Sequence, residues 1–445
     1  MQPSQLKNIT NKIIDYTKQV CLKQPADTSI FSVKILTGKN KWQLLGSFGL
    51  EWWITQHGRH CCEDIADMAI KFDSQLQGGD REYFYEIIET TFRENADNLD
   101  IFNVDSVFLR LVDNLFEARA IKNANEFALV LWREIRSNLE KSIANWIILY
   151  PLRQIKSSSY SLSFDGLSLL ASNDRDVWEQ RSAYYGEAKY WNPVFGIWKN
   201  EQNQSTFKEF IGVQTWLVCE TSGTKLASKK QAGQRMRTFL ALLFSYLDNQ
   251  EHTLLLKSGA DTACYAIQFP DDPTKVGSRC VNSPIGILAP PLLVNGFLNI
   301  SSEILAEVCD WYLQRDSAPD NPKNRAITAS QFIHYAIIHN DLERFLHFFI
   351  ALDALFGERY KVEKNIVESV RYIFPGDPKW ENRIEKLYEL RNELVHGGAS
   401  SISDWSEFYN YRRQFKSYPL QDIKTFAMRA LTLYFKHRLY RHFFT

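Results

Sequence analysis

The sequence predicts a mainly α-helical protein with a mixed α/β region in its middle. Segments near both ends, such as "REYFYEIIETTF" and "LERFLHFFIALDALF", carry apolar residues at three- and four-residue spacing, which is typical of amphipathic helices. Short apolar runs between Gly-, Asn- and Asp-rich connections indicate strands in the middle. A chain of 445 residues is too long to fold around a single hydrophobic core. We therefore expect a mostly helical region at 1–145, a mixed α/β domain at 146–300 and an all-helical bundle at 301–445.

The middle domain is predicted from three candidate strands and one helix. The strands are "WIILYPLRQI" (146–155), "QTWLVCET" (214–221) and "HTLLLKSG" (252–259). The helix is the apolar, Gly-poor segment at 229–249. A Pro- and Gly-containing stretch at 287–296 is a candidate boundary of this domain, because these residues interrupt regular structure.

The C-terminal region carries a series of helical patterns. The expected helices are Glu303–Gln314, Ala329–His339, Asp341–Glu358, Val362–Ile373, Lys379–His396 and Leu420–Phe444. The turn "FPGDPKW" separates two of them, since its prolines and glycine stop one helix and start the next.

Composition excludes several classes of protein. Net charge is zero, so the chain is not a nucleic-acid binder working by bulk charge. The N-terminus lacks the apolar core of a signal peptide, and the longest apolar run, 239–247, is too short to cross a bilayer. Seven scattered cysteines suit a reducing compartment better than a disulfide framework. We expect a cytoplasmic protein without membrane contacts.

Charge is distributed unevenly along the chain. From 63 to 117 there are fourteen acidic residues and four basic ones, whereas from 401 to 445 there are eight basic residues and three acidic ones. The C-terminal surplus indicates either an anion-binding surface or an ordinary solvated helix face.

The segment "YELRNELVHGG" (388–398) places a cation in an apolar helical stripe. On a helical wheel the stripe consists of Ile384, Leu387, Tyr388 and Val395, with Leu394 at its margin. Arg391 falls in the middle of this stripe, and Asn392 and His396 border it. Because an unpaired buried charge is costly, Arg391 requires an anionic partner.

Asp353 is the candidate partner of Arg391. It lies on the apolar stripe of the preceding helical segment, which contains Leu342, Phe345, Leu346, Phe349 and Phe356. Two apolar helices that carry one charge each, of opposite sign, predict a hydrogen-bonded pair within one subunit or across a dimer. The pair is either a structural salt bridge or an acid that positions an active-site arginine.

The two motifs together resemble the HEPN family, in particular its ApeA-like branch. "ALDALFGE" (351–358) is similar to the acidic helix of that family, and "LYELRNELVHGG" (387–398) is similar to its Arg-polar-x3-His helix. The resemblance covers roughly residues 325–445. It implies a helical bundle that dimerises and acts as a metal-independent ribonuclease, with many members in toxin–antitoxin, abortive-infection or anti-phage systems.

The resemblance also implies roles for individual residues. Arg391 would bind phosphate, His396 would transfer protons, Asn392 would orient them, and Asp353 would be the supporting acid. The chemistry suits RNA, whose 2′-OH is an internal nucleophile that needs proton transfer and stabilisation of phosphorane charge. Since one histidine does not easily serve as both base and acid, we expect a homodimer with two motifs facing one cleft.

Basic residues after Ser401 are candidates for drawing RNA to this cleft. Arg412, Arg413 and Lys416 are the expected substrate-binding residues. We expect no cofactor and no metal, and an antitoxin or other regulatory partner is an open expectation.

A second cluster, "HGRHCCED", brings together His57, His60, Cys61 and Cys62. It indicates either a zinc site or ordinary packing, and its spacing matches no common structural zinc site.

Three functions remain open: a ribonuclease effector, a non-catalytic HEPN scaffold that binds RNA or protein, and a regulator that binds a ligand through its middle domain. The intact Arg-Asn-x3-His motif favours the first.

Overall fold

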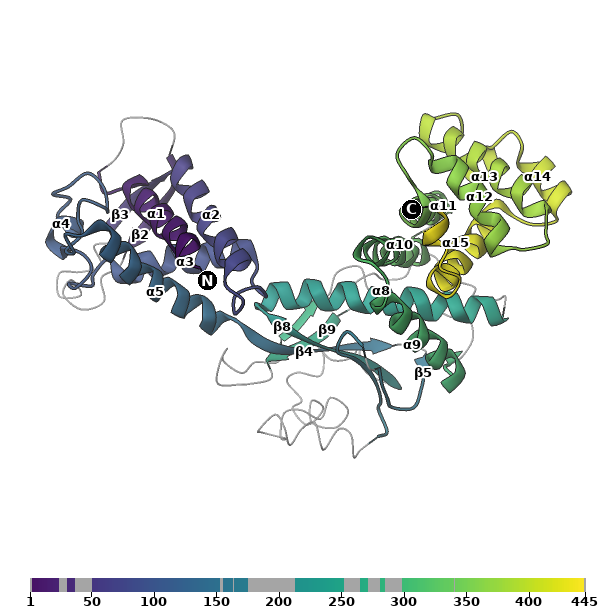
Figure 1. The fold of residues 1–445 in the computed structure, drawn as a ribbon, viewed down its shortest axis with the longest axis horizontal. Coiled ribbons are helices and arrows are strands. Elements are labelled where there is room, and N and C mark those ends of the chain that lie inside the picture. The colour runs from purple at the N-terminus through teal and green to yellow at the C-terminus, as the bar shows by residue number, and fades with distance from the viewer. Residues whose placement is uncertain are drawn as a thin grey trace, which may run out of the picture. The chain divides into compact units, whose positions relative to one another are not determined.

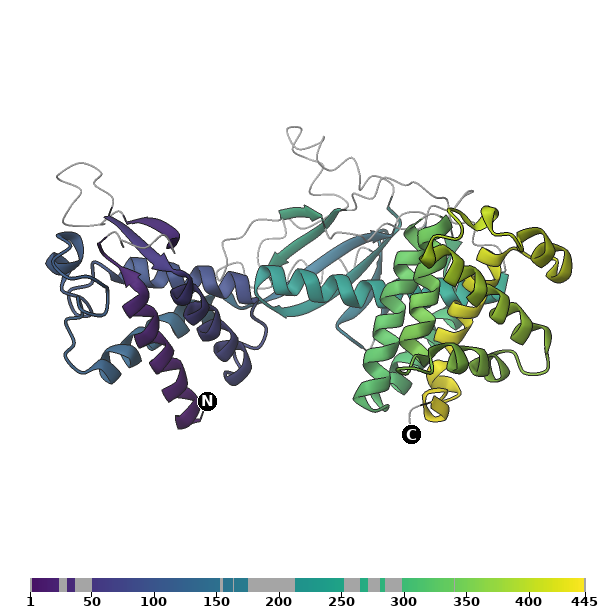
Figure 2. The ribbon, with the colours of Figure 1, turned by 90° about the horizontal axis from the view of Figure 1, so that it is seen from above.

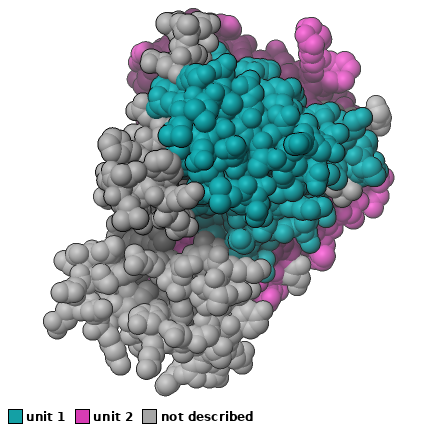
Figure 3. Space-filling view, turned by 90° about the vertical axis from the view of Figure 1, so that its left-hand side faces the viewer, with its two compact units in different colours: residues 1–146, 221–229, 270–278 teal, residues 147–220, 230–269, 279–445 magenta. Residues whose placement is uncertain are grey.

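The structure is a computed structural model that describes residues 2–23, 30–36, 50–152, 155–162, 164–174, 213–251, 265–270, 281–284, 298–339 and 341–443. The chain divides into two compact units, which are coloured separately in Figure 3. Unit 1 contains residues 1–146, 221–229 and 270–278, and unit 2 contains residues 147–220, 230–269 and 279–445. The predicted mainly α fold is confirmed.

Unit 1 is built from helices around a core of its own. The helices are α1 (Pro3–Gln19), α2 (Gln56–Phe72), α3 (Arg81–Asn95), α4 (Val104–Phe108) and α5 (Ala124–Ser142). Polar side chains start several of them. The side chain of Asp80, for example, accepts a hydrogen bond from the Tyr83 amide at 3.3 Å and so satisfies a free donor of α3.

Unit 1 also contains a three-stranded sheet that the helical patterns did not predict. Its order is β1 (Val20–Cys21), β3 (Leu50–Thr55), β2 (Ile30–Leu36), and both pairings are antiparallel. The run "LEWWIT" of β3 has no helical period. Such a short and nearly continuous apolar run does not distinguish a buried strand from a helix segment, because its residues do not alternate with polar ones at either spacing.

Most residues of a six-stranded sheet belong to unit 2. Its spatial order is β10 (Val281–Pro284), β9 (Tyr265–Pro270), β4 (Ala144–Leu152), β8 (Thr215–Gly223), β7 (Leu167–Ala171) and β6 (Tyr160–Ser161). A parallel pair, β5 (Ile155–Lys156) and β11 (Leu298–Asn299), stands beside it as a separate two-stranded sheet. The predicted mixed middle region is therefore present, while the expected strand at 252–259 and the expected boundary at 287–296 lie outside the described residues.

Helix α8 (Lys225–Glu251) lies along the six-stranded sheet, with α10 and α15 on its other side (Figure 1). Nearly every side chain from Phe239 to Leu247 is buried, and these residues share one hydrophobic core with both the sheet and the C-terminal helices. The hydroxyl of Ser330 on α10 donates to the hydroxyl of Thr238 on α8 at 2.9 Å. The middle region and the C-terminal helices are therefore one compact unit.

The C-terminal part of unit 2 is an all-helical bundle, as predicted. It consists of α9 (Ser302–Asp316), α10 (Asp320–Ile338), α11 (Asp341–Phe356), α12 (Val362–Ile373), α13 (Lys379–His396), the 3₁₀ turn η5 (Ile402–Asp404), α14 (Phe408–Phe415), α15 (Pro419–Lys436) and α16 (Tyr440–Phe443). Three details differ from expectation, and the first is that α10 begins at Asp320, nine residues before the expected start at Ala329. The short helix α14 was not predicted, and the expected helix Leu420–Phe444 is divided, because Arg438 has a left-handed φ of 50°.

Helix α11 is the central helix of this bundle. It packs against α10, α12, α13 and α15 of the same chain, and Figure 2 shows α10 and α11 running side by side. Its apolar surplus is therefore largely buried within the chain. Leu342 and Leu346 stay partly exposed and Ile350 is 38% exposed, so the expectation that a second apolar face of this helix meets a symmetry mate stays a prediction.

None of the helices in the described ranges combines the length and the apolar character that a membrane crossing requires.

Candidate active site

The motif helix α13 ends where the two glycines begin. Gly397 adopts a left-handed φ of 80°, and its N–H donates to the carbonyl of Glu393. The N–H of Gly398 donates to the same carbonyl at 2.8 Å. A glycine in this conformation is a common helix stop, because a side chain there is strained. His396 is consequently the last helical residue, and Arg391 and His396 lie on one helix as predicted.

The buried face of α13 differs from the predicted stripe. The buried side chains are Trp380, Ile384, Leu387, Leu390 and Leu394. Val395, which was expected on this face, is 50% exposed. The face is rotated by roughly 60° about the helix axis relative to expectation. Arg391 therefore lies at the edge of the apolar face and is half-buried, because the neighbouring helices select which stripe becomes core.

Arg391 is held by two neighbours on its own helix. Its Nη1 donates to Oδ1 of Asn392 at 3.0 Å. Its guanidinium carbon lies 5.7 Å from the centre of the Tyr388 ring, within the range of a cation–π contact. The first contact joins two residues of the motif, and the orienting role of Asn392 stays a prediction.

Asp353 lies near the C-terminal end of α11, at the margin of the buried face of that helix. Burial raises the pKa of its carboxyl group, and the positive charge of Arg391 opposes this rise. The two groups are thus electrostatic neighbours.

The hydrogen bond expected between Asp353 and Arg391 is not formed within one chain, and a contact across a dimer stays a prediction. Within the described chain, neither a hydrogen bond nor an ion pair joins the two side chains. Each side chain is only half-buried. Water therefore relieves part of the desolvation that would otherwise force them together.

His396 is exposed at the end of α13. It is five residues after Arg391, which places the two side chains about 140° apart around the helix and about 7.5 Å apart along it. Asn392 lies between them, about 40° from His396. The three residues therefore form a row that runs around the helix from the edge of the core to open solvent. A single chain does not direct Arg391 and His396 to one face.

The expected substrate-binding residues lie on another element. Arg412 and Arg413 belong to α14, and Lys416 follows its last residue. Helix α14 contacts the N-terminal half of α13, where Nη2 of Arg383 donates to the carbonyl of Phe415 at 3.3 Å. These basic residues are therefore near the motif helix but not beside His396.

Part of the C-terminal basic surplus is structural. Lys424 is buried and forms an ion pair of 2.7 Å with Asp248 of α8. Such a residue cannot serve an RNA surface. The count of charges along the chain could not reveal this, because the pairing joins residues that are distant in sequence.

The cluster "HGRHCCED" lies on α2, and the side chains of Cys61 and Cys62 are buried whereas those of His57 and His60 are exposed. Sγ of Cys61 is 3.7 Å from Nε2 of His57. Within the residues that the structure describes, no group of three or more His, Cys, Asp or Glu side chains is placed to hold a metal ion.

A cavity of about 480 Å³ lies in unit 1. It is lined by Leu6, Asp73, Ser74, Gln75, Leu129, Trp132, Arg133 and Arg136. Arg136 donates to Asp73 at 2.7 Å and to Gln75 at 2.8 Å. Because these polar groups bind one another, the cavity does not indicate the chemistry of a ligand.

Comparisons with protein-family models, with curated proteins and with solved structures found no match to this chain. The functional argument therefore rests on the residues and their geometry.

Proposed function

We propose that this protein is a metal-independent endoribonuclease of the HEPN type that acts as an effector in toxin–antitoxin or anti-phage defence. The observation that carries the proposal is the row of Arg391, Asn392 and His396 at the end of one bundle helix. It combines a guanidinium held by a neighbouring amide with an exposed imidazole. Asp353 adds a half-buried carboxylate whose charge acts on Arg391.

The proposed reaction uses the 2′-OH of the RNA as the nucleophile. A guanidinium binds phosphate oxygens in a bidentate manner and stabilises the charge of the phosphorane. An imidazole, whose ordinary pKa is near 6.5, transfers protons in either direction at neutral pH. The 5′-oxygen leaves with a proton, so the products carry a 2′,3′-cyclic phosphate and a 5′-OH.

We further propose that two chains share the site. Arg391 and His396 diverge around one helix, so a single phosphate reaches both only with difficulty. A second chain related by a two-fold axis would place its imidazole opposite the Arg391 of the first and would divide the acid and base roles. Val395, half-exposed and one turn after Arg391, leaves apolar surface beside the motif for such a contact.

The test is incubation of the purified full-length protein with total RNA in EDTA. We expect cleavage by the wild type, and a loss of 10²-fold or more for Arg391→Ala and for His396→Ala. His437→Ala is the matched control, since His437 is an exposed histidine just beyond α15 and outside the motif. End-group analysis of the products and light scattering of the protein test the chemistry and the dimer.

Cleavage that EDTA abolishes, with 5′-phosphate products, would exclude this mechanism. Wild-type rates in both motif variants would exclude these residues as catalysts. RNA binding without any cleavage would favour a non-catalytic HEPN scaffold, in which Arg391 has a structural role.

A further inference from the structure

A group of aromatic and basic side chains, all exposed except the partly buried Arg412, lies on and just after α14. We call this group the α14 surface, and its members are Tyr409, Arg412, Arg413, Lys416 and Tyr418. The Tyr409 side chain is 75% exposed and that of Tyr418 is 53% exposed. The Tyr409 ring contacts the Phe408 ring edge to face at 5.5 Å, and both tyrosines still leave a large part of their surface open to a ligand.

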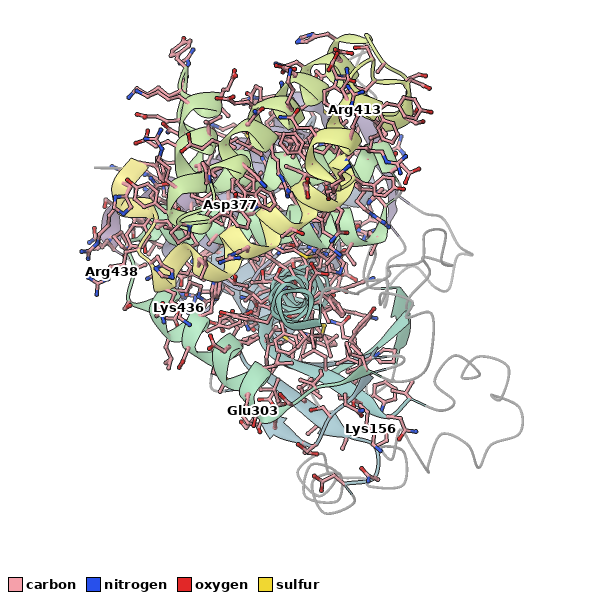
Figure 4. The ribbon with its side chains drawn as sticks, turned by 90° about the vertical axis from the view of Figure 1, so that its right-hand side faces the viewer. Lys156, Glu303, Asp377, Arg413, Lys436 and Arg438 are labelled. Carbon is pink, nitrogen blue, oxygen red and sulfur yellow. The ribbon has the colours of Figure 1, made fainter. Side chains whose placement is uncertain are left out.

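The orientation of α14 directs these side chains outward. Tyr411 and Phe415 are the buried residues of this helix. Tyr409 and Arg413 are one turn apart and lie on the opposite side of the helix from the buried pair. Figure 4 shows Arg413 at the outer edge of the bundle. The helix thus presents an aromatic ring and a guanidinium side by side to solvent.

Tyr418 is held in position by Arg412. Nη2 of Arg412 donates to the Tyr418 hydroxyl at 2.8 Å, and the guanidinium lies 4.2 Å from the centre of the same ring. The guanidinium carbon of Arg412 also lies 5.7 Å from the centre of the Phe408 ring, at the N-terminal end of α14. A ring fixed in this way loses little conformational freedom when a planar ligand stacks on it.

Within the part of the chain that the structure describes, the cations of the α14 surface have no acidic partners. The segment 408–418 contains three basic residues and no acidic residue. Arg413 donates only to the neutral side chain of Asn410, at 3.2 Å. The neighbouring acid Asp422 is buried and accepts from Tyr411 and Ser417 at 2.6 and 2.7 Å. Among the described residues, no carboxylate forms an ion pair with Arg412, Arg413 or Lys416.

We propose that the α14 surface binds single-stranded RNA. Bases would stack on Tyr409 and Tyr418, while Arg413 and Lys416 bind phosphates. Aromatic rings interleaved with cations are the recurring means of binding single strands, since every base has a stacking face. Tyrosine and arginine are also enriched at protein interfaces, but every charged residue between 408 and 418 is basic, which matches a polyanion.

The position of the surface explains why its ligand is a polymer. The α14 surface lies beside the Arg383 end of α13, and His396 is thirteen residues further along that helix. This separation corresponds to about 20 Å along the helix axis. A mononucleotide does not span this distance, whereas a chain of several nucleotides does. The inference rests on the proposed function for its choice of RNA and extends it to a second binding surface.

The experiment measures binding without cleavage. Full-length protein carrying His396→Ala is titrated against a fluorescent single-stranded 12-mer RNA, with anisotropy as the readout. We expect Tyr409→Ala combined with Arg413→Ala to raise Kd about tenfold or more, because one stacked base and one phosphate contact are lost. Both side chains are exposed, so the thermal midpoint should not change.

Lys416 offers a variant with a matched control. Lys416 has a left-handed φ of 54°, and exposed Arg438 beyond α15 has a φ of 50°. Figure 4 places Arg438 on the side of the bundle opposite Arg413. Lys416→Gly and Arg438→Gly therefore remove one cation each from a backbone that glycine readily adopts. Lys416→Gly should weaken RNA binding and reduce the slope of log Kd against log salt by about 0.7, whereas Arg438→Gly should change neither.

The outcomes separate the two proposals. If the α14 variants lose binding and no cleavage occurs in any variant, the surface is correct and the nuclease assignment fails. If cleavage requires His396 but the α14 variants bind RNA like the parent protein, the surface is wrong. Equal affinity for duplex RNA, or no RNA binding, also overturns it.

Discussion

Replacing Lys424 by methionine is expected to destabilise unit 2 by about 3–5 kcal/mol, the usual effect of removing one member of a buried ion pair. The Nζ atom of Lys424 lies 2.7 Å from Oδ1 of Asp248, and their side chains are 9% and 4% exposed. The variant keeps the apolar stem of the side chain but leaves a carboxylate buried without a counter-charge. The pair links α15 to α8, so the perturbation tests whether the sheet region and the bundle unfold together.

The structure provides a matched control on the same helix. Lys436 forms an ion pair of 3.4 Å with Glu307, and these side chains are 53% and 44% exposed. Lys436→Met should cost less than about 1 kcal/mol, because solvent screens an exposed pair. The double variant Lys424→Met, Asp248→Leu should recover most of the lost stability, since apolar side chains replace both buried charges.

Urea unfolding of the full-length variants, followed by tryptophan fluorescence and circular dichroism, measures these differences. Coincident transitions by the two probes are required before free energies are compared. Equal losses for Lys424→Met and Lys436→Met, or a double variant no more stable than Lys424→Met, would refute the reasoning. Either result would mean that the carboxylate of Asp248 finds water or another donor when Lys424 is absent.

Two further predictions concern pH. Burial raises the pKa of Asp353, although the charge of Arg391 opposes this rise. The folded state therefore binds the carboxyl proton more tightly than the unfolded state does. Ionisation of Asp353 at neutral pH consequently costs stability. Asp353→Asn should therefore stabilise the protein at pH 7, and this gain should shrink as the pH falls towards 4. A loss of stability at pH 7 would instead show that the folded protein stabilises the ionised carboxylate. Burial, and to a lesser extent the charge of Arg237, lowers the pKa of His334 from 6.5 to about 3. Below about pH 6.5 only the unfolded state therefore takes up a proton at this histidine. The stability of the protein should consequently fall as the pH drops below about 6.5. His334→Leu should reduce that slope by up to about 1.4 kcal/mol per pH unit in urea titrations between pH 6.5 and 4, and an unchanged slope would contradict the assignment.

The local pattern of the sequence determined most of the helical architecture. The bounds predicted for the helices at 362–373 and 379–396 agree with α12 and α13, because long periodic segments and a glycine stop are local signals. The sequence also placed Arg391, Asn392 and His396 on one helix end. Short elements were missed, among them α14 and the strands of unit 1, since so few residues repeat a pattern too few times to distinguish it from chance.

Tertiary contacts decided which face of each helix became core. The wheel of α13 predicted Arg391 at the centre of the buried stripe, but packing against α11, α12 and α15 placed it at the edge. Packing also decided which charges are buried. Lys424, one of the basic residues of the C-terminal surplus, forms an ion pair inside unit 2, whereas Lys416 remains exposed. The local pattern of a helix shows that an apolar stripe exists. The helices packed against it determine which face is buried and which charged side chains are removed from water.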